Sequence, residues 1–278
     1  MKGIISGIKR MEIHDGDGLR TTVFFKGCSL KCIWCHNPES ISFEPQIARF
    51  KEKCIGCQSC SGLDMKDAVK ICPTAALTLF GTEYEATELS DILSEDIEFF
   101  KKSSGGVTFS GGECLAQPKF AWELAKLLTD KGISVNIDTS GYVKKEVLDE
   151  IIPYTDTFLY DIKAIDTDLH KRLTGKDNSV ILDNLNYLSQ RGCRIEIRYP
   201  FVVGMNDHEA EKIALFLKNI KGIKKVKVLR YHDFSRSRYE ALSMTDTLPE
   251  NKTTEDAVRD AVNVFLRHGI NAVDGMNE

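Results

Sequence analysis

The chain lacks long apolar runs and has little net charge. No apolar stretch approaches the ~20 residues needed to cross a bilayer. The 37 basic and 41 acidic residues leave a net charge of −4, which gives no sign of a broad nucleic-acid-binding face. At the N-terminus, Lys9, Arg10 and Glu12 interrupt the apolar residues before a signal peptide could form. We therefore expect a cytoplasmic protein that binds neither membranes nor nucleic acid.

Internal repeats, low-complexity tracts and flexible linkers are also missing. Hydrophobic residues make up 42% of the sequence and charged residues 28%, which is typical of a globular domain. A chain of 278 residues is long enough for one barrel-sized domain with an insertion, or for two ordinary domains.

The nine cysteines are clustered rather than spread. There is one group of three, one group of four and two isolated residues, in this order: Cys28, Cys32 and Cys35; Cys54, Cys57, Cys60 and Cys72; Cys114 and Cys193. In a reducing compartment, such clusters favour metal binding over disulfides. Thiolates select zinc, Cu(I) or iron–sulfur clusters. For the isolated pair, a buried and inert thiol is the expected state.

Strand-like and helix-like stretches alternate along most of the chain. The predicted strands are short, apolar and rich in β-branched and aromatic residues: Thr21–Lys26, Val107–Ser110, Ile133–Asp138, Thr157–Ile162, Arg194–Tyr199 and Val226–Tyr231. Helical patterns separate or follow them at Leu89–Lys102, Lys119–Lys131, Lys144–Ile152, Asp168–Leu173, Val180–Arg191, Glu209–Ile220 and Glu255–His268, the last capped by Thr253 or Thr254. This alternation predicts an α/β fold with a parallel sheet.

A polar or glycine-bearing segment follows each predicted strand. In chain order these segments are GCSLKC, SGGEC, DTSG, DIK, RYPFVVGMND and YHDF. The loops at the carboxyl ends of parallel barrel strands converge on one mouth, where functional residues gather. Six such units predict an open (β/α)6 partial TIM barrel rather than the closed barrel of eight.

The segment between about Pro45 and Leu79 breaks this alternation and contains the group of four cysteines. We interpret residues 45–80 as a small insertion organised by metal rather than by an apolar core. The barrel would then comprise residues 1–44, with the three-cysteine motif, and residues 81–278.

The three-cysteine group has two interpretations. A structural zinc site would need a fourth ligand, such as His36. The alternative is a 4Fe–4S cluster with three cysteine ligands and one open iron. The spacing Cys-x3-Cys-x2-Cys, with Trp34 before the last cysteine, resembles the signature of radical S-adenosylmethionine (radical SAM) enzymes. In that family, S-adenosylmethionine chelates the fourth iron.

The resemblance narrows to one subgroup, the glycyl-radical enzyme activating enzymes. It is carried by DGDGLRTTVFFKGC from Asp15, WCHNPES from Trp34, GGVTFSGGE from Gly105, YDIK from Tyr160, IRYP from Ile197, GMND from Gly204 and LRYH from Leu229. One departure is Asp17, where many relatives have proline. Both flanking glycines are kept, so the turn should survive.

The resemblance implies a reaction and a set of site residues. One electron from the reduced cluster would cleave S-adenosylmethionine to a 5′-deoxyadenosyl radical, which would abstract a Cα hydrogen from a glycine of a partner glycyl-radical enzyme. A flavodoxin or ferredoxin-type protein would donate the electron. Such clusters are oxygen-sensitive, which implies an anaerobic host. The residues implied to contact S-adenosylmethionine are Trp34, His36, Gly112, Glu113, Asp138, Asp161, Lys163 and His232. Lys163 and Arg198 are assigned to catalysis, although Arg198 could equally be a salt-bridged barrel arginine.

The insertion resembles the ferredoxin-like segment of many such activases, with a second departure. Larger members carry two cysteine quartets, whereas this chain has Cys54, Cys57 and Cys60 followed by Cys72-Pro73. One quartet suffices for one auxiliary 4Fe–4S cluster. A four-thiolate zinc site is the alternative.

Two other functions compete with this one. The chain could be another radical SAM enzyme, acting on a small molecule or activating anaerobic ribonucleotide reductase. It could also be a non-catalytic electron carrier, which would not need the polar segments at successive strand ends.

Overall fold

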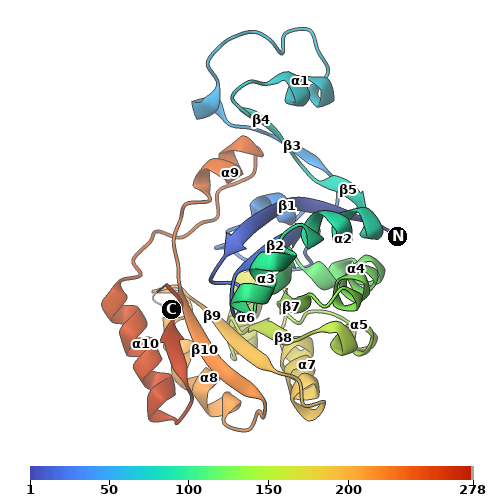
Figure 1. Cartoon of the computed structure of the whole chain (residues 1–278). Helices are drawn as coiled ribbons and strands as arrows, with labels where there is room; N and C mark the ends of the chain where they lie inside the picture. Colours follow the sequence, from blue (N-terminus) through green and yellow to red (C-terminus); the bar gives the residue numbers. More distant parts are fainter. Residues whose placement is uncertain (277–278) are drawn as a thin grey trace.

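Six parallel strands form the centre of the molecule. The computed structural model describes residues 1–276 (Figure 1). The parallel strands are β2 (Arg20–Phe25), β6 (Gly106–Gly111), β7 (Ser134–Thr139), β8 (Thr157–Asp161), β9 (Ile195–Phe201) and β10 (Ile223–Arg230). They lie side by side in chain order, and each overlaps its predicted range. The predicted α/β fold with a mostly parallel sheet is confirmed.

Three more strands complete a nine-stranded sheet. Its order is β11-β10-β9-β8-β7-β6-β2-β1-β5. At one edge, β1 (Lys2–Glu12) pairs antiparallel with both β2 and β5 (Thr82–Glu85). At the other edge, β11 (Ala272–Asp274) runs parallel to β10. Local sequence does not predict these edge strands, because β1 carries glycines and charges and β11 has only three residues.

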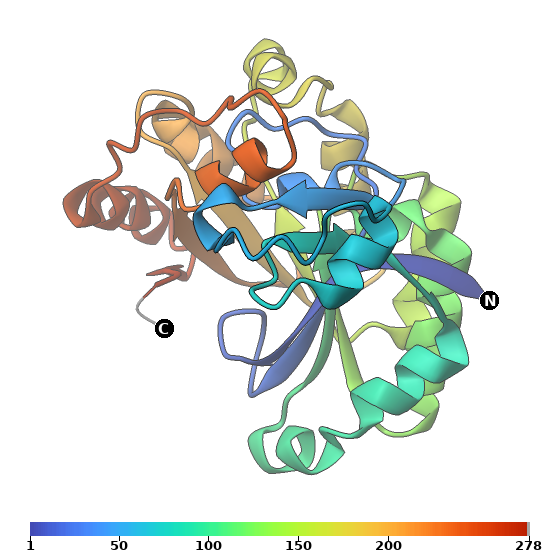
Figure 2. The same ribbon diagram turned by 90° about the horizontal axis from the view of Figure 1, so that it is seen from above.

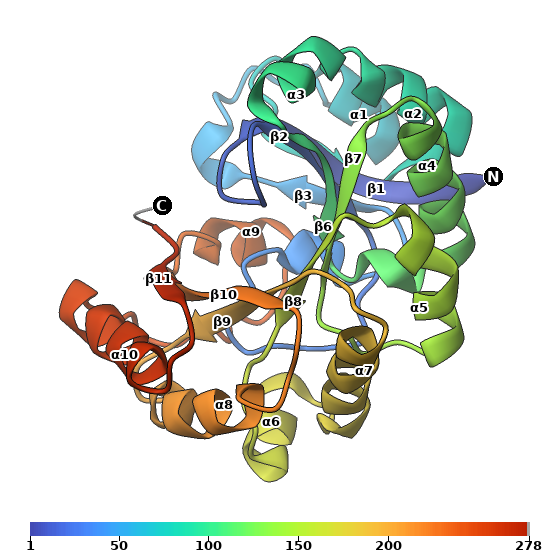
Figure 3. The same ribbon diagram turned by 60° about the horizontal axis from the view of Figure 1, so that its bottom comes forward.

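Helices cover the outer face of the curved sheet (Figure 3). They are α2 (Ala86–Ser94), α3 (Ile97–Ser103), α4 (Pro118–Asp130), α5 (Lys145–Ile151), α6 (Thr167–Thr174), α7 (Ser179–Gln190), α8 (Ala210–Leu217) and α10 (Glu255–Arg267). In α4, Phe120, Leu124 and Leu128 recur at helical spacing and enter the main core. The cap of α10 is Thr254, whose side chain accepts from the Ala257 N–H.

One predicted helix, Leu89–Lys102, is broken into α2 and α3. The break falls at Glu95 and Asp96. The Asp96 carboxylate accepts hydrogen bonds from Arg10 Nη1 (2.6 Å) and Thr21 Oγ1 (2.8 Å). This anchors the break to β1 and β2, a long-range contact that local periodicity does not reveal.

The insertion projects beyond the main sheet. Strands β3 (Gln46–Arg49) and β4 (Leu77–Phe80) pair antiparallel, and α1 (Met65–Ile71) lies between them in the chain. Figure 1 shows this segment above the sheet, and Figure 2 shows it from above beside α9 (Arg236–Ala241). Neither α1 nor α9 is among the predicted helices. Within residues 1–276, no helix is long and apolar enough to cross a membrane.

Candidate active site

A cavity of about 210 Å³ lies at the carboxyl ends of the parallel strands. The three thiols of the first cysteine group line it. Side chains from successive strand ends complete the wall, among them Trp34, His36, Ser110, Gly112, Asp138, Thr139, Ser140, Asp161, Lys163, Arg198, Val202 and Tyr231. The structure therefore brings most of the residues predicted for the cofactor site into one cavity.

The three cysteines of this cavity are half-buried. Burial raises the pKa of Cys28 to about 12 and raises the pKa values of Cys32 and Cys35. Because the thiolate is the form that binds metal, a metal must displace these protons. The Lys163 ammonium donates to Asp161 Oδ2 at 2.6 Å. Burial opposes its charge, yet Asp161 and the neighbouring thiols leave the pKa of Lys163 above its ordinary value.

Arg198 is both an ion-paired arginine and part of the cavity wall. Its Nη2 lies 3.1 Å from Asp15 Oδ1 and 3.0 Å from the carbonyl oxygen of His14, and its Nη1 lies 3.3 Å from Asp138 Oδ2. Burial raises the pKa of Asp138 to about 7, although Arg198 opposes this shift. Asp15 is half-buried, which opposes its charge, but Arg198 and the Thr22 hydroxyl hold its pKa below its ordinary value. Motif spacing gives no role to Asp15, since its partner lies on β9.

Two residues predicted to contact the cofactor lie outside the cavity lining. Glu113 is buried, and its carboxylate accepts from Thr139 Oγ1 (2.8 Å), Ser140 N (3.0 Å) and Ser140 Oγ (2.6 Å). It holds in place the loop that lines the cavity. His232 lies in an adjoining groove, where it stacks on His36 with ring centroids 4.1 Å apart.

Two side chains of the cavity wall carry polar atoms without a hydrogen-bond partner. His36 Nε2 and Arg198 Nε are buried without a hydrogen-bond partner, and both side chains line the cavity. Buried polar atoms normally have partners. Together with three thiols, these atoms fit an iron–sulfur cluster and a zwitterionic cofactor beside it.

The four insertion cysteines line a second cavity of about 220 Å³. Cys54, Cys57 and Cys60 are exposed and Cys72 is half-buried. The two isolated cysteines belong to neither cavity. Cys114 is buried as predicted, but Cys193 is only half-buried. Among residues 1–276, no three His, Cys, Asp or Glu side chains are close enough to share a single metal ion.

Comparison with known protein families identifies the superfamily of this chain. The model of the radical SAM superfamily matches residues 22–217. This chain belongs to that superfamily. The match includes the three-cysteine group, the insertion and the strand ends as far as β9.

Curated relatives narrow the class further. The trans-4-hydroxy-L-proline dehydratase activating enzyme of Clostridioides difficile is 38% identical over 87% of this chain and 88% of its own length. The choline trimethylamine-lyase activating enzyme of Oleidesulfovibrio alaskensis is 33% identical, covering 96% and 95%. A domain of the pyruvate-formate lyase-activating enzyme of Bacteroides vulgatus superposes with a TM-score of 0.52 at 26% identity, covering 61% of this chain and 98% of that domain. The chain is a radical SAM enzyme of the glycyl-radical activating group.

Proposed function

We propose that the cavity between Cys28 and Arg198 is where this activating enzyme converts S-adenosylmethionine and admits the glycine of its partner. Cys28, Cys32 and Cys35 would hold a 4Fe–4S cluster with one open iron. When both groups are bound, the reduced cluster would supply the electron that cleaves the cofactor to a 5′-deoxyadenosyl radical. The observation that carries the proposal is the convergence of three half-buried thiols and strand-end polar groups in one cavity.

The chain's own residues would bind, orient and shield the cofactor. Lys163, held against Asp161, offers a cation to the cofactor carboxylate. His36 Nε2 has free hydrogen-bonding capacity, and Trp34 is buried beside the thiols. A Cβ added to Gly112 would lie only 2.4 Å from the Ser40 carbonyl oxygen, so a side chain there would disturb the Cys28–Ser40 loop.

Arg198 and Asp138 would act where the partner's glycine meets the cavity. Arg198 is buried and forms ion pairs with Asp138 and with Asp15 of the N-terminal loop. A cation between two carboxylates is positioned to bind backbone carbonyl groups of an incoming loop without a large net charge. The partner would be a glycyl-radical enzyme, and the electron donor a flavodoxin or ferredoxin-type protein.

The insertion, residues 45–80, would be a ferredoxin-like domain with one auxiliary 4Fe–4S cluster on Cys54, Cys57, Cys60 and Cys72. The shared cavity of these four thiols supports this proposal. A four-thiolate zinc site remains the competitor, and metal analysis separates the two. The rest of the chain would form the partial barrel of six units, consistent with the two free edges of the sheet.

The test is anaerobic reconstitution with iron and sulfide, followed by reduction and addition of S-adenosylmethionine. We expect release of 5′-deoxyadenosine and about eight irons per chain. Cys32→Ala should abolish release, whereas Cys57→Ala should retain about half of the iron. Cys193→Ala is the matched control and should behave as wild type. No release from fully loaded, reduced protein would contradict the proposal and favour the electron carrier.

A second step tests the partner. The loaded enzyme is mixed with trans-4-hydroxy-L-proline dehydratase or with pyruvate formate-lyase, and the glycyl radical is measured by electron paramagnetic resonance. We expect a signal with at least one such enzyme and a strongly reduced signal with Arg198→Lys. Cofactor cleavage without a radical on either protein would exclude these two enzymes as partners and point to another glycyl-radical enzyme.

A further inference from the structure

We propose that α9 is a positioning element that connects the insertion to the Cys35 loop. Ser235 at the N-cap of α9, together with Arg238 and Tyr239 of the helix, would hold that loop in place. The C-terminal end of α9, which contacts the insertion, would pass a structural change in the insertion on to the loop. The proposal rests on the assignment of Cys35 as a cluster ligand and adds residues that neither the sequence motifs nor the cavity lining contain.

The first step is the set of hydrogen bonds from α9 and its cap to the Cys35 loop. Ser235 Oγ and Tyr239 Oη each donate to the carbonyl oxygen of Cys35 at 3.2 Å. Arg238 Nη1 donates to the carbonyl oxygen of His36 at 3.1 Å and to Glu39 Oε1 at 2.7 Å. Three side chains from one short segment therefore fix the backbone on both sides of the Cys35–His36 peptide.

Two of the three side chains that make these contacts are buried. Ser235 and Tyr239 are each 2% exposed. Tyr239 packs in a small apolar cluster with Trp34, Val202 and Tyr231, all of which line the active-site cavity. Hydrogen bonds made away from water are costly to break. The orientation of Cys35 is thus set from outside the cavity, as outer residues orient ligands in other metal sites.

The second step is the contact between α9 and the insertion. Ala241 at the end of α9 is buried against Ala48 and Phe50, with Leu242 and Phe80 beside them. Lys51 adds an exposed ion pair to Glu240 at 2.9 Å. In Figures 1 and 2, α9 lies beside the paired strands β3 and β4.

Strand β3 connects α9 to the cavity of the insertion cysteines because its adjacent side chains point to opposite faces. Ala48 packs toward α9, whereas the adjacent Arg49 lines the cavity of the four insertion cysteines. The Phe50 N–H donates to the carbonyl oxygen of Ala76, and Ala76 lines the same cavity. A continuous set of packed groups therefore runs from the auxiliary site through β3 and α9 to Cys35.

A chelator challenge of the metal-loaded full chain tests this proposal. Iron release is followed by absorbance, and the freed thiols are alkylated and mapped by mass spectrometry, so that each cysteine group is read separately. Tyr239→Phe removes one hydroxyl without changing the packing. We expect alkylation of Cys35 to become about threefold faster, and about tenfold faster when Ser235→Ala is added, with Cys54 and Cys57 unchanged.

The matched control is Tyr187→Phe. The Tyr187 hydroxyl bonds to Asp149 and Arg191 on the outer helices, away from the cavity. This variant should release iron as wild type does. Equal alkylation of Cys35 in Tyr239→Phe and Tyr187→Phe would overturn the positioning role.

The connection to the insertion is tested with Phe50→Ala, and Phe50→Leu should restore wild-type behaviour because it keeps an apolar contact. We expect Phe50→Ala to accelerate alkylation of Cys35 as well as that of the insertion cysteines. If only the insertion cysteines respond, α9 does not transmit the change. These readouts do not require cofactor cleavage, so failure of the proposed reaction would leave them interpretable.

Discussion

At the scale of single residues, the site combines carboxyl groups whose pKa values are set by burial and by a neighbouring cation. Asp138 and Asp15 share one cation, Arg198, yet their pKa values move in opposite directions. A carboxyl group whose pKa is raised by folding binds its proton more tightly in the folded state than in the unfolded state. Stability linked to such a group is present at low pH and is lost as pH rises through the folded-state pKa.

This gives a pH-dependent prediction for Asp138. The pKa of Asp138 is about 7 in the folded chain, against an ordinary value of 3.8. Asp138 should therefore lower the free energy of unfolding as pH rises from about 4 to 7. Asp138→Asn should remove up to about 1.4 kcal/mol per pH unit of that slope. Urea unfolding at several pH values checks this. Asp130→Asn, at the exposed end of α4, should leave the slope unchanged.

Glu113 provides the second prediction at this scale. Four hydrogen bonds from Leu115, Thr139 and Ser140 converge on its carboxylate. Glu113→Gln would put an amide donor against these donors and should cost about 1–3 kcal/mol of stability. Because Thr139 and Ser140 line the cavity, the KM for S-adenosylmethionine should rise more than kcat falls. An unchanged KM would mean that the loop does not depend on Glu113.

At the scale of elements, the N-terminal loop shows why a glycine is needed directly after Asp17. Gly18 has φ of +72°, and a Cβ there would lie 2.4 Å from the Ser103 carbonyl oxygen. Asp17 replaces proline in the family pattern and forms an ion pair with Lys224. The loop is thus held by close backbone packing and by charge rather than by a proline ring.

Gly18→Ala should therefore destabilise the chain by about 2–5 kcal/mol, since left-handed strain and a backbone clash add. The control is Gly192→Ala, where φ is +71° but no atom lies within 4 Å of the added Cβ. It should cost only about 1–2 kcal/mol. Thermal or urea unfolding separates the two variants. Equal losses would show that conformation alone, and not the contact with Ser103, requires glycine at position 18.

The elements also show what local sequence can predict. The six parallel strands are predictable because each is a short apolar run followed by polar residues. The strand β1 and the helix α9 are not, because neither has a periodic apolar pattern, and both are fixed by distant partners. For the same reason, motif spacing identifies Cys35 and Lys163, whereas Asp15 and Tyr239 need the fold.

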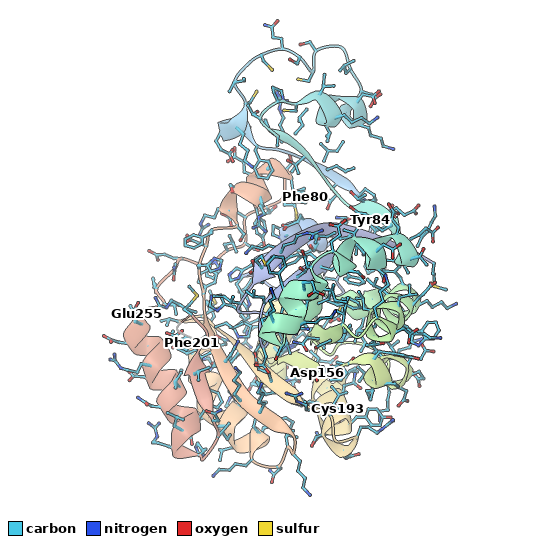
Figure 4. The ribbon with its side chains drawn as sticks, viewed as in Figure 1. Phe80, Tyr84, Asp156, Cys193, Phe201 and Glu255 are labelled. Carbon is cyan, nitrogen blue, oxygen red and sulfur yellow. The ribbon has the colours of Figure 1, made fainter. Side chains whose placement is uncertain are left out.

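At the scale of the whole molecule, the insertion lies outside the main core and shares a small apolar cluster with the end of α9. The main core contains no residue between 46 and 80, and the paired β3 and β4 bring the ends of the insertion together. In Figure 4, Phe80 and Tyr84 lie where the insertion meets the main sheet, whereas Cys193 and Asp156 lie at the far side of the molecule. The parallel sheet and its helices should therefore fold without the insertion.

Replacing residues 46–80 with a short glycine–serine turn tests this. We expect a folded chain with near-native circular dichroism and about four irons instead of about eight. The three-cysteine cluster should nevertheless lose iron to a chelator faster, because Ala241 of α9 would lose its contacts with Ala48 and Phe50. An unfolded product would show that the barrel needs the insertion to fold. A product with wild-type iron release would show that α9 holds Cys35 without support from the insertion.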